Sequence, residues 1–322
     1  MPTLVRAEGA LLDRIYDDTW PIWGDGLTRS AYARFNDAQM RTDWGAASLQ
    51  RVAWVEDGVL LASAKRYALT LSLSGEQVRC LGIGAVFTPP PLRGRGLAAA
   101  MIEAMVEAAA DEGAEYALLY SEIGAGYYER LGFEALPLAE TLVTLKAQPR
   151  AGAPAVLVRA GDERDFGDIA VLHERRASGF LLAQYRSPEY ARHTIAKQRM
   201  LAALSQPGLR HVDFFIVEEG ASAVAYVAIT HGLGGRVLQE WGDRDPTGAR
   251  VGAMLQVLAA RTPAEKDEPL RTWLPDEFLP PQLEWMGTAT PREVPMLRRL
   301  APHRPSPSEL AADMFLLKGD AF

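Results

Sequence analysis

Two periodicities of hydrophobic residues run through the first half of the chain. Alternating or continuous apolar runs, which are typical of strands, lie at about 3–7, 50–56, 59–70, 77–87 and 116–121, with a final pair of strands reaching to about 146. Asp57-Gly58 separates the second run from the third and predicts a tight hairpin turn. The strands therefore begin as an antiparallel meander.

Helical periodicity predicts one or two helices across 9–41, a helix over about 95–112 that ends at Gly113, and a short helix near 124–131. The helix at 95–112 has an apolar stripe (Leu97, Met101, Ile102, Met105, Ala109) and acidic residues opposite (Glu103, Glu107, Asp111). Such a helix packs against a sheet. The order of elements predicts an α/β (α+β) fold, in which a mixed, largely antiparallel sheet is flanked by helices.

Short phrases of the first half recur in the second. "LVRA" occurs at 4–7 and again at 157–160, and "VEDG" at 55–58 is echoed by "VEEG" at 217–220. Internal similarity of this kind indicates a duplicated domain. Residues 147–154, "AQPRAGAP", separate the halves and have the composition of a linker. We therefore predict two tandem domains, at 1–147 and 155–322.

Composition narrows the class of protein. The 322 residues are 48% hydrophobic and 23% charged, with a formal net charge of −7, so the basic character of a nucleic-acid-binding protein is missing. No apolar run is long enough to span a membrane and the N-terminus does not have the pattern of a signal peptide, so a soluble, cytoplasmic protein is expected. The single cysteine, Cys80, lies in an apolar run, and the five histidines show no metal-ligand spacing, so no metal is expected.

Residues 91–98, "PLRGRGLA", stand where a strand gives way to a helix. The first N–H groups of a helix lack intrahelical acceptors and form a natural anion site. Glycines let the backbone approach a phosphate closely, and arginines add charged hydrogen bonds. The segment therefore predicts a phosphate-binding turn, with a plain glycine turn and solvated arginines as the alternative.

A dinucleotide-binding motif is a rival interpretation of the same glycines. Gly94, Gly96 and Ala99 satisfy the pattern G-x-G-x-x-A, and Glu122 closes the next strand as a ribose ligand would. However, three prolines at 89–91 stand between strand and glycines, and the unit follows an antiparallel meander in mid-chain. Both features disagree with that motif.

A second motif, "SEIGAGYYERLGF" at 121–133, follows the glycines. Together with Arg93-x-x-Gly96-x-Ala98, its Tyr-Glu-Arg-Leu-Gly-Phe sequence resembles the GNAT superfamily of N-acetyltransferases, over most of residues 1–146. The resemblance implies acetyl-coenzyme A (acetyl-CoA) as co-substrate and the amine of a small molecule as acceptor.

The resemblance assigns the cofactor site to three places in the chain. Backbone groups of Val86, Phe87 and Thr88 would hold the pantetheine arm. The phosphate-binding turn would cradle the pyrophosphate through Arg93, Gly94, Arg95, Gly96, Leu97 and Ala98. Ser121 stands where the family often has Asn, and Gly124 replaces the usual Ala.

Tyr128 matches the family's tyrosine that faces the thioester. A phenol with a pKa near 10 stays protonated at neutral pH, so it can protonate the departing thiolate. The alternative is that Tyr128 only packs beside Tyr127 and Phe133.

Two carboxylates are candidates for the base that deprotonates the amine. Glu122 is near Tyr128 in sequence, but it is equally consistent with a solvated charge at a strand end. Phe322 is the other candidate, because the tandem acetyltransferases of the enhanced-intracellular-survival family, which this chain also resembles, use a C-terminal carboxylate. The sequence given is too short for that family's third domain. The strand pattern "MFLLKG" at 314–319 predicts that this end is docked in a sheet.

The second half lacks the two motifs. At an offset of 153 residues, Arg93, Gly96 and Ala98 correspond to Pro246, Ala249 and Val251. We therefore predict a degenerate domain that binds no cofactor and either shapes the substrate pocket or serves as a structural partner.

Four aromatic residues lie in the helical region that overhangs the acceptor site in this family: Trp20, Trp23, Tyr32 and Trp44. They could box an amine by cation–π contact or belong to the core. The phrases "WGDGLTRSAY" and "FTPPPLRGRG" also resemble fungal lysine N-acetyltransferases, which favours an amino acid or polyamine over an aminoglycoside-type antibiotic or a protein lysine. A non-catalytic acyl-CoA sensor is the competing class, and homo-oligomer formation stays open.

Overall fold

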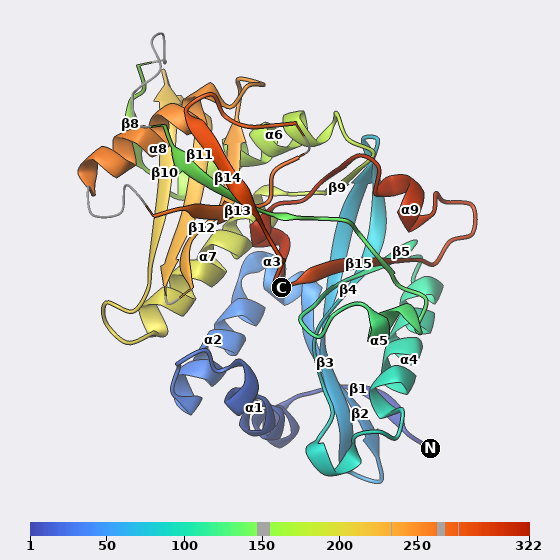
Figure 1. The fold of residues 1–322 in the computed structure, drawn as a ribbon. Coiled ribbons are helices and arrows are strands. Elements are labelled where there is room, and N and C mark those ends of the chain that lie inside the picture. The colour runs from blue at the N-terminus through green and yellow to red at the C-terminus, as the bar shows by residue number, and fades with distance from the viewer. Residues whose placement is uncertain (147–154, 233, 263–267, 276) are drawn as a thin grey trace.

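A computed structural model describes residues 1–146, 155–232, 234–262, 268–275 and 277–322 (Figure 1). The predicted linker at 147–154 lies outside this range. The described residues form two mixed sheets with helices packed on them, as the sequence predicted.

The first half follows the predicted order of elements. It contains β1 (Thr3–Arg6), α1 (Gly9–Trp23), α2 (Arg29–Arg41), α3 (Asp43–Ser48), β2 (Leu49–Glu56), β3 (Val59–Leu73), β4 (Glu76–Phe87), α4 (Leu97–Asp111), β5 (Tyr116–Ser121), α5 (Gly126–Glu129), β6 (Glu134–Ala135) and β7 (Glu140–Leu145). The turn between β2 and β3 has positive φ at Asp57 and Gly58, as a tight hairpin requires. The short helix α3 was not predicted.

The second half contains β8 (Val158–Ala160), α6 (Phe166–Ala177), β9 (Leu182–Gln184), α7 (Pro188–Leu204), β10 (His211–Glu219), β11 (Ser222–Gly232), β12 (Gly235–Asp243), α8 (Ala249–Arg261), β13 (Leu270–Thr272), β14 (Leu283–Ala289), β15 (Val294–Arg299), α9 (Pro307–Leu310) and β16 (Met314–Phe315). Short 3₁₀ turns lie at Pro90–Leu92, Glu163–Asp165 and Lys318–Asp320.

The two sheets repeat one topology and exchange one strand. The first has the order β1-β2-β3-β4-β5-β15-β6, and the second, read in the same direction, β8-β10-β11-β12-β13-β7-β14. The sixth place of each sheet is therefore filled by a strand from the other half of the chain. The expected final pair of strands in the first half is wrong in this respect, because β6 and β7 do not pair with each other. Local pattern identified both strands, but their partners lie far away in sequence.

Helix α4 covers one face of the first sheet with the predicted stripe. Met101, Ile102, Met105 and Ala109 are buried against strand residues such as Ala64. Glu103, on the opposite side of the helix, forms an ion pair of 2.7 Å with Arg298 of the exchanged strand β15. The stripe thus fixes α4, and with it the turn before α4, on the sheet.

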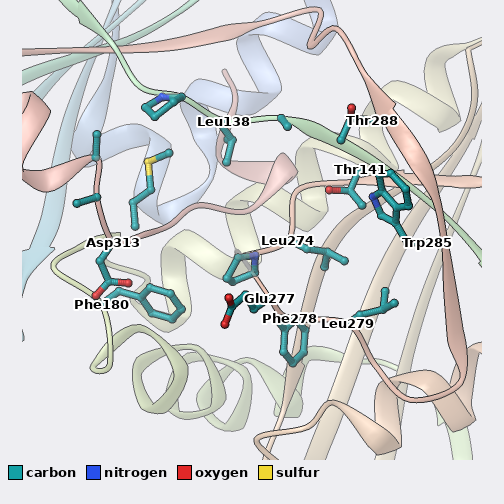
Figure 2. Close-up of a pocket in the computed structure, with 16 residues that line it drawn as sticks. Leu138, Thr141, Phe180, Leu274, Glu277, Phe278, Leu279, Trp285, Thr288 and Asp313 are labelled. Atoms are coloured by element: carbon teal, nitrogen blue, oxygen red, sulfur yellow. The ribbon is translucent and has the colours of Figure 1, made fainter.

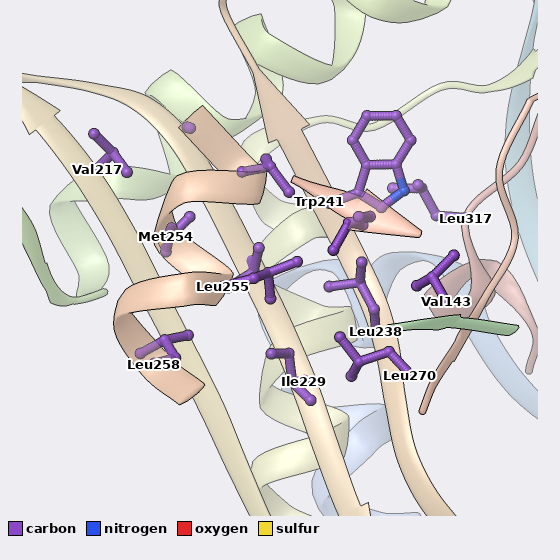
Figure 3. Close-up of a cluster of buried hydrophobic side chains, with 14 of the residues drawn as sticks. Val143, Val217, Ile229, Leu238, Trp241, Met254, Leu255, Leu258, Leu270 and Leu317 are labelled. Atoms are coloured by element: carbon purple, nitrogen blue, oxygen red, sulfur yellow. The ribbon is translucent and has the colours of Figure 1, made fainter. Parts of the chain in front are cut away.

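The second half has a hydrophobic core of its own (Figure 3). Met254, Leu255 and Leu258 of α8 pack against the buried strands β11 and β12. Val143 from the exchanged β7 and Leu317 from the C-terminal segment complete this core. Hydrophobic burial therefore ties the exchanged strand β7 and the C-terminal segment to the second sheet.

The C-terminal segment lies between the two sheets, near the centre of the molecule (Figure 1). Arg186 is fully buried and binds Asp320 of this segment and Glu240 of β12, each at 2.7 Å. Only Met314 and Phe315 of the predicted "MFLLKG" strand pair with another strand, β9. The expected docking of this end is confirmed, although buried ionic and aromatic contacts make most of it.

Two buried histidines are expected to make the fold acid-sensitive. Burial lowers the pKa of His173 to about 3, assisted by Arg186, and burial together with Lys197 and Lys65 lowers the pKa of His193 to about 3. In the unfolded chain the same two histidines titrate with a pKa near 6.5. The folded state therefore keeps its full stability with respect to these histidines above pH 6.5, and it loses stability as the pH falls from there towards 3. Urea unfolding at pH 7.5 and 5.0 should show a loss of about 2 kcal/mol per histidine. The control His303→Gln, at an exposed position, should show the same dependence of the unfolding free energy on pH as the natural protein. His173→Gln should show a weaker dependence. An unchanged dependence in His173→Gln would contradict the role given to this histidine.

Candidate active site

Strand β4 carries a bulge where the predicted pantetheine site begins. Its pairing with β3 passes from Lys65↔Gly84 to Ser63↔Phe87, which leaves Ala85 and Val86 opposite a single residue, and Ala85 has a φ of +46°. On the other side, the parallel ladder to β5 ends at Ile83 and Leu119. Beyond this point the strands separate, and the backbone groups of the bulge become available to a ligand.

The turn before α4 has the features expected of an anion site. Gly94 and Gly96 have φ of +76° and +74°, and Gly96 is the N-cap of α4. No side chain caps this helix and no acidic residue occupies its first turn, whereas Thr28 caps α2 and Ser187 caps α7. Arg93 and Arg95 are exposed, and in the described part of the chain neither forms an ion pair; Arg93 Nε donates to the Thr88 carbonyl at 3.1 Å. The helix start thus retains its unneutralised positive end.

A pocket of about 320 Å³ joins the bulge to the proposed catalytic residues. It is lined by Val86, Glu122, Tyr128 and Phe322, which the sequence suggested separately, and by Ala85 of the bulge. Phe87 and Thr88, by contrast, lie just outside it: Phe87 is buried and paired with Ser63. Four of the sequence-predicted residues are therefore brought together around one cavity.

Tyr128 is 8% exposed and faces this pocket from α5. Burial, and to a smaller degree Tyr127, raises its pKa to about 12. Its ring also packs edge-on against Phe133, so the packing role weighed from the sequence is present as well. The hydroxyl is thus fixed in position and keeps its proton at any physiological pH.

Glu122 and Ser121 follow the end of β5. Glu122 is partly exposed and lies 3.5 Å from Arg292. Ser121 is buried and donates to the Gly124 carbonyl at 2.6 Å, so its side chain shapes the loop that leads to α5. Of the two, only Glu122 lines the pocket.

Phe322 packs its ring onto strand β4. The ring centre is 4.2 Å from that of Tyr67 and 5.2 Å from that of Tyr120. A Cβ placed at Gly82 or Gly84 would lie 3.0 or 3.1 Å from this ring, so the two glycines provide the space for it. Lys197 adds a hydrogen bond to the Ala321 carbonyl at 2.8 Å. The end of the chain is therefore held beside the β4 bulge.

Sequence reasoning missed two cations in the same pocket, Arg51 and Lys65. Each lies in an alternating strand and resembles a solvent-facing charge. Parity along the strand could have identified them, because Arg51 shares its face with Leu49 and Ala53, and Lys65 shares its face with Tyr67. A charge on the apolar face of a strand points into the protein.

The four aromatic candidates have different positions. Trp23 and Tyr32 line the pocket. Trp44 instead packs against Tyr190 of α7, with ring centres 4.8 Å apart, and Trp20 donates to the Leu27 carbonyl near the surface. Two of the four are thus available to an acceptor, and Trp44 belongs to the core between the halves.

The second half keeps a glycine at the start of the equivalent helix, α8, but one of its own carboxylates occupies the place of a bound anion. Gly248, with a φ of +72°, caps α8 as Gly96 caps α4, so the offset is 152 residues and the predicted match of Gly96 to Ala249 is wrong. The Asp243 carboxylate accepts from the N–H groups of Arg250 and Val251 at 2.8 and 3.0 Å. The chain's own carboxylate therefore takes the place of an external anion.

A larger pocket of about 560 Å³ lies elsewhere and contains none of the predicted site residues (Figure 2). Leu138, Phe180, Leu274, Phe278 and Trp285 contribute apolar side chains to its wall. It lies between the segment that joins the two sheets and the loops of the second half, and its described lining includes two titratable residues, Glu277 and Asp313.

Strand pairing also assembles a possible metal-ligand set that sequence spacing did not show. His211 and His231 are directly opposite on β10 and β11, and with Asp213 they place three donor atoms within 4.8 Å of one another. His231 Nε2 and Asp213 Oδ2 are 3.0 Å apart, so a hydrogen bond accounts for this contact without a metal. The cluster lies in the second half, apart from the pocket of Tyr128.

Comparison with known families agrees with this geometry. Residues 17–136 match the family model described as "Acetyltransferase (GNAT) domain". The chain therefore carries a GNAT acetyltransferase domain, and the resemblance found in the sequence is confirmed. The match over residues 17–136 supports an N-acyltransferase, as predicted. No curated protein matches the sequence.

Solved structures share the fold at low sequence identity. A GCN5-related N-acetyltransferase from Anabaena variabilis has a TM-score of 0.68 and 12% identity over 93% of this chain and 73% of its own. Eis1 from Mycobacterium abscessus has a TM-score of 0.59 and 15% identity over 93% and 74%. A tandem GNAT protein from the clavulanic acid biosynthesis pathway has a TM-score of 0.53 and 12% identity over 94% and 99%. The tandem GNAT-like fold is thereby confirmed.

No helix in the described ranges combines the length and the apolar character needed to cross a membrane.

Proposed function

We propose that the protein is an acetyl-CoA-dependent N-acetyltransferase that acts on the primary amine of a small molecule. The observation that carries the proposal is the pocket in which Tyr128, Glu122 and Phe322 meet the β4 bulge. The uncapped start of α4, with its glycines and arginines, fits the pyrophosphate of the cofactor.

The residues have separable roles in direct transfer from acetyl-CoA to the amine. Backbone groups of the bulge orient the thioester, which supplies the activated acetyl group. Tyr128 holds the proton that the departing thiolate needs. The Phe322 carboxylate, or Glu122, accepts the proton that the ammonium group must lose before it can attack.

The second half contributes to the pocket through Glu293 and through the C-terminal residues Ala321 and Phe322. Because Asp243 fills the start of α8, we propose one cofactor site per chain. This is the degenerate second domain expected from the missing motifs.

A non-catalytic acyl-CoA sensor is the competing function. A sensor needs the phosphate-binding turn but has no use for a protonated phenol fixed in the pocket. Tyr128 therefore favours the enzyme.

Release of free CoA thiol from acetyl-CoA with a panel of amines distinguishes the two functions. Cys80 adds no background to a thiol assay, because it is buried and burial raises its pKa. We expect amine-dependent thiol release, and calorimetry with one CoA per chain. Tight CoA binding without release for any amine would establish the sensor, and two CoA per chain would contradict the single site.

The variant Gly96→Val is expected to weaken CoA binding tenfold or more. Its φ of +74° disfavours a branched residue, and the new side chain would stand where the pyrophosphate approaches. The matched control is Gly75→Val in the β3–β4 turn, which has a φ of +89° and equally open space. Both variants should lose similar stability, but only the first should lose CoA affinity in calorimetry. Equal affinities would remove Gly96 from the site.

A further inference from the structure

Arg51 is a buried charge that forms no ion pair with any residue that the structure describes. Arg51 lies on β2 and only 2% of its surface is exposed. Its Nε and Nη1 atoms have no hydrogen-bond partner among the described residues. An unpaired charge inside a protein costs several kcal/mol, so it calls for a specific explanation. Arg51 also lines the pocket of Tyr128, so a ligand in that pocket can reach it.

Lys65 places a second basic side chain at the same place. It is directly opposite Arg51 in the β2–β3 ladder, where two like charges destabilise a sheet. Its only hydrogen bond described is 3.4 Å long and goes to the neutral amide of Gln39. Burial, Arg51 and Lys197 lower the pKa of Lys65 well below its ordinary value. A bound anion would therefore stabilise the protonated forms of both Arg51 and Lys65.

The acidic side chains of the pocket are engaged elsewhere, and no ion pair described joins the Phe322 carboxylate, which also lines the pocket, to Arg51 or Lys65. Glu293 binds Lys318 at 2.6 Å and Glu122 lies 3.5 Å from Arg292. Arg51 on β2 pairs with Lys65 on β3, and Lys65 pairs with Gly84 on β4. The backbones of Arg51 and Gly84 are therefore two strand spacings apart, or about 10 Å. The side chain of Arg51 and one small molecule can cover that distance to the bulge beside Gly84.

We propose that the acceptor is a free amino acid, whose carboxylate is bound by Arg51 with Lys65 while its amine faces the β4 bulge. This rests on the acetyltransferase function proposed above and narrows its substrate class. A polyamine or an aminoglycoside would instead bring further positive charge next to an uncompensated guanidinium. Trp23, Tyr32 and Phe35 provide an aromatic wall for the remainder of the molecule.

Matched acceptor pairs that differ only in the carboxylate test the proposal: lysine with cadaverine, phenylalanine with phenethylamine, and leucine with isopentylamine. We expect kcat/KM for at least one amino acid to exceed that of its amine by about a hundredfold or more, because the amine leaves the buried cation unpaired.

In Arg51→Met the ratio of kcat/KM between amino acid and amine should fall towards one, because the activity with the amino acid is lost. The control Arg6→Met, at an exposed position on β1, should keep the ratio. Equal activity within every pair, or an undiminished ratio in Arg51→Met, would overturn the proposal.

Thermal unfolding provides a readout that does not depend on acetylation. Removing an unpaired buried charge should leave the Tm of Arg51→Met equal or raised, whereas a purely structural Arg51 would make it fall. With CoA present, amino acids but not their amines should raise the Tm of the natural protein, and neither should raise that of Arg51→Met. If no amine is acetylated, the proposed function fails, and this binding experiment alone decides whether the pocket selects a carboxylate.

Discussion

Replacing Tyr128 by Phe is expected to lower kcat about a hundredfold without changing the affinity for CoA, because the variant loses the group that protonates the departing thiolate. The ring and its contacts with Tyr127 and Phe133 are retained, so the fold should persist. Steady-state kinetics and calorimetry on the same preparation measure the two quantities.

Tyr127→Phe is the matched control, because Tyr127 is adjacent in sequence but does not line the pocket. It should turn over normally. The pH profile adds a further check: since the pKa of Tyr128 is raised to about 12, its deprotonation should cause no loss of activity between pH 8 and 10. A Tyr128→Phe enzyme with near-normal kcat would exclude the phenol from the mechanism.

Shifting the C-terminal carboxylate should reduce turnover at least tenfold, since one residue moves it by about 3.5 Å, beyond hydrogen-bond reach. Two changes separate the carboxylate from the ring. Deleting Phe322 removes both, and adding one glycine after Phe322 moves the carboxylate but keeps the ring on Gly82 and Gly84. CoA affinity should be unchanged in both proteins.

The deletion should also cost about 1–2 kcal/mol of stability, because the ring is partly buried against Tyr67 and Tyr120. The glycine extension should be nearly as stable as the natural protein, and a glycine added before Met1 serves as the control for both. Normal turnover of both C-terminal variants would transfer the role of base to Glu122.

Local pattern predicted most of the first half correctly. The Asp57-Gly58 hairpin, the apolar stripe of α4 and the glycine turn before α4 each depend on residues close together in sequence. Local rules of conformation and periodicity suffice for such features. The GNAT resemblance added the expected site residues, of which Val86, Glu122, Tyr128 and Phe322 line one cavity.

Contacts between residues that lie far apart in the sequence could not be predicted from local pattern. The pairing of β5 with β15 joins Ser121 to Val294, and nothing in either strand specifies the other as its partner. Parity along β2 could have placed Arg51 on the inner face, but its pairing with Lys65 of the next strand is visible only in the fold. The repeat indicated the duplication, but a conserved repeat does not show that two strands have changed places.

The exchange of β7 and β15 has a consequence for how the chain reaches its fold during synthesis. The first sheet cannot close between β5 and β6 until Val294–Arg299 has been made. Roughly 170 residues separate β5 from β15, so at about 5–20 residues per second the ribosome needs on the order of ten to thirty seconds to supply the missing strand. Throughout that interval the nascent GNAT domain exposes two unpaired strand edges, which invite pairing with other chains. Slower growth at low temperature or a chaperone that covers those edges should therefore raise the yield of folded protein.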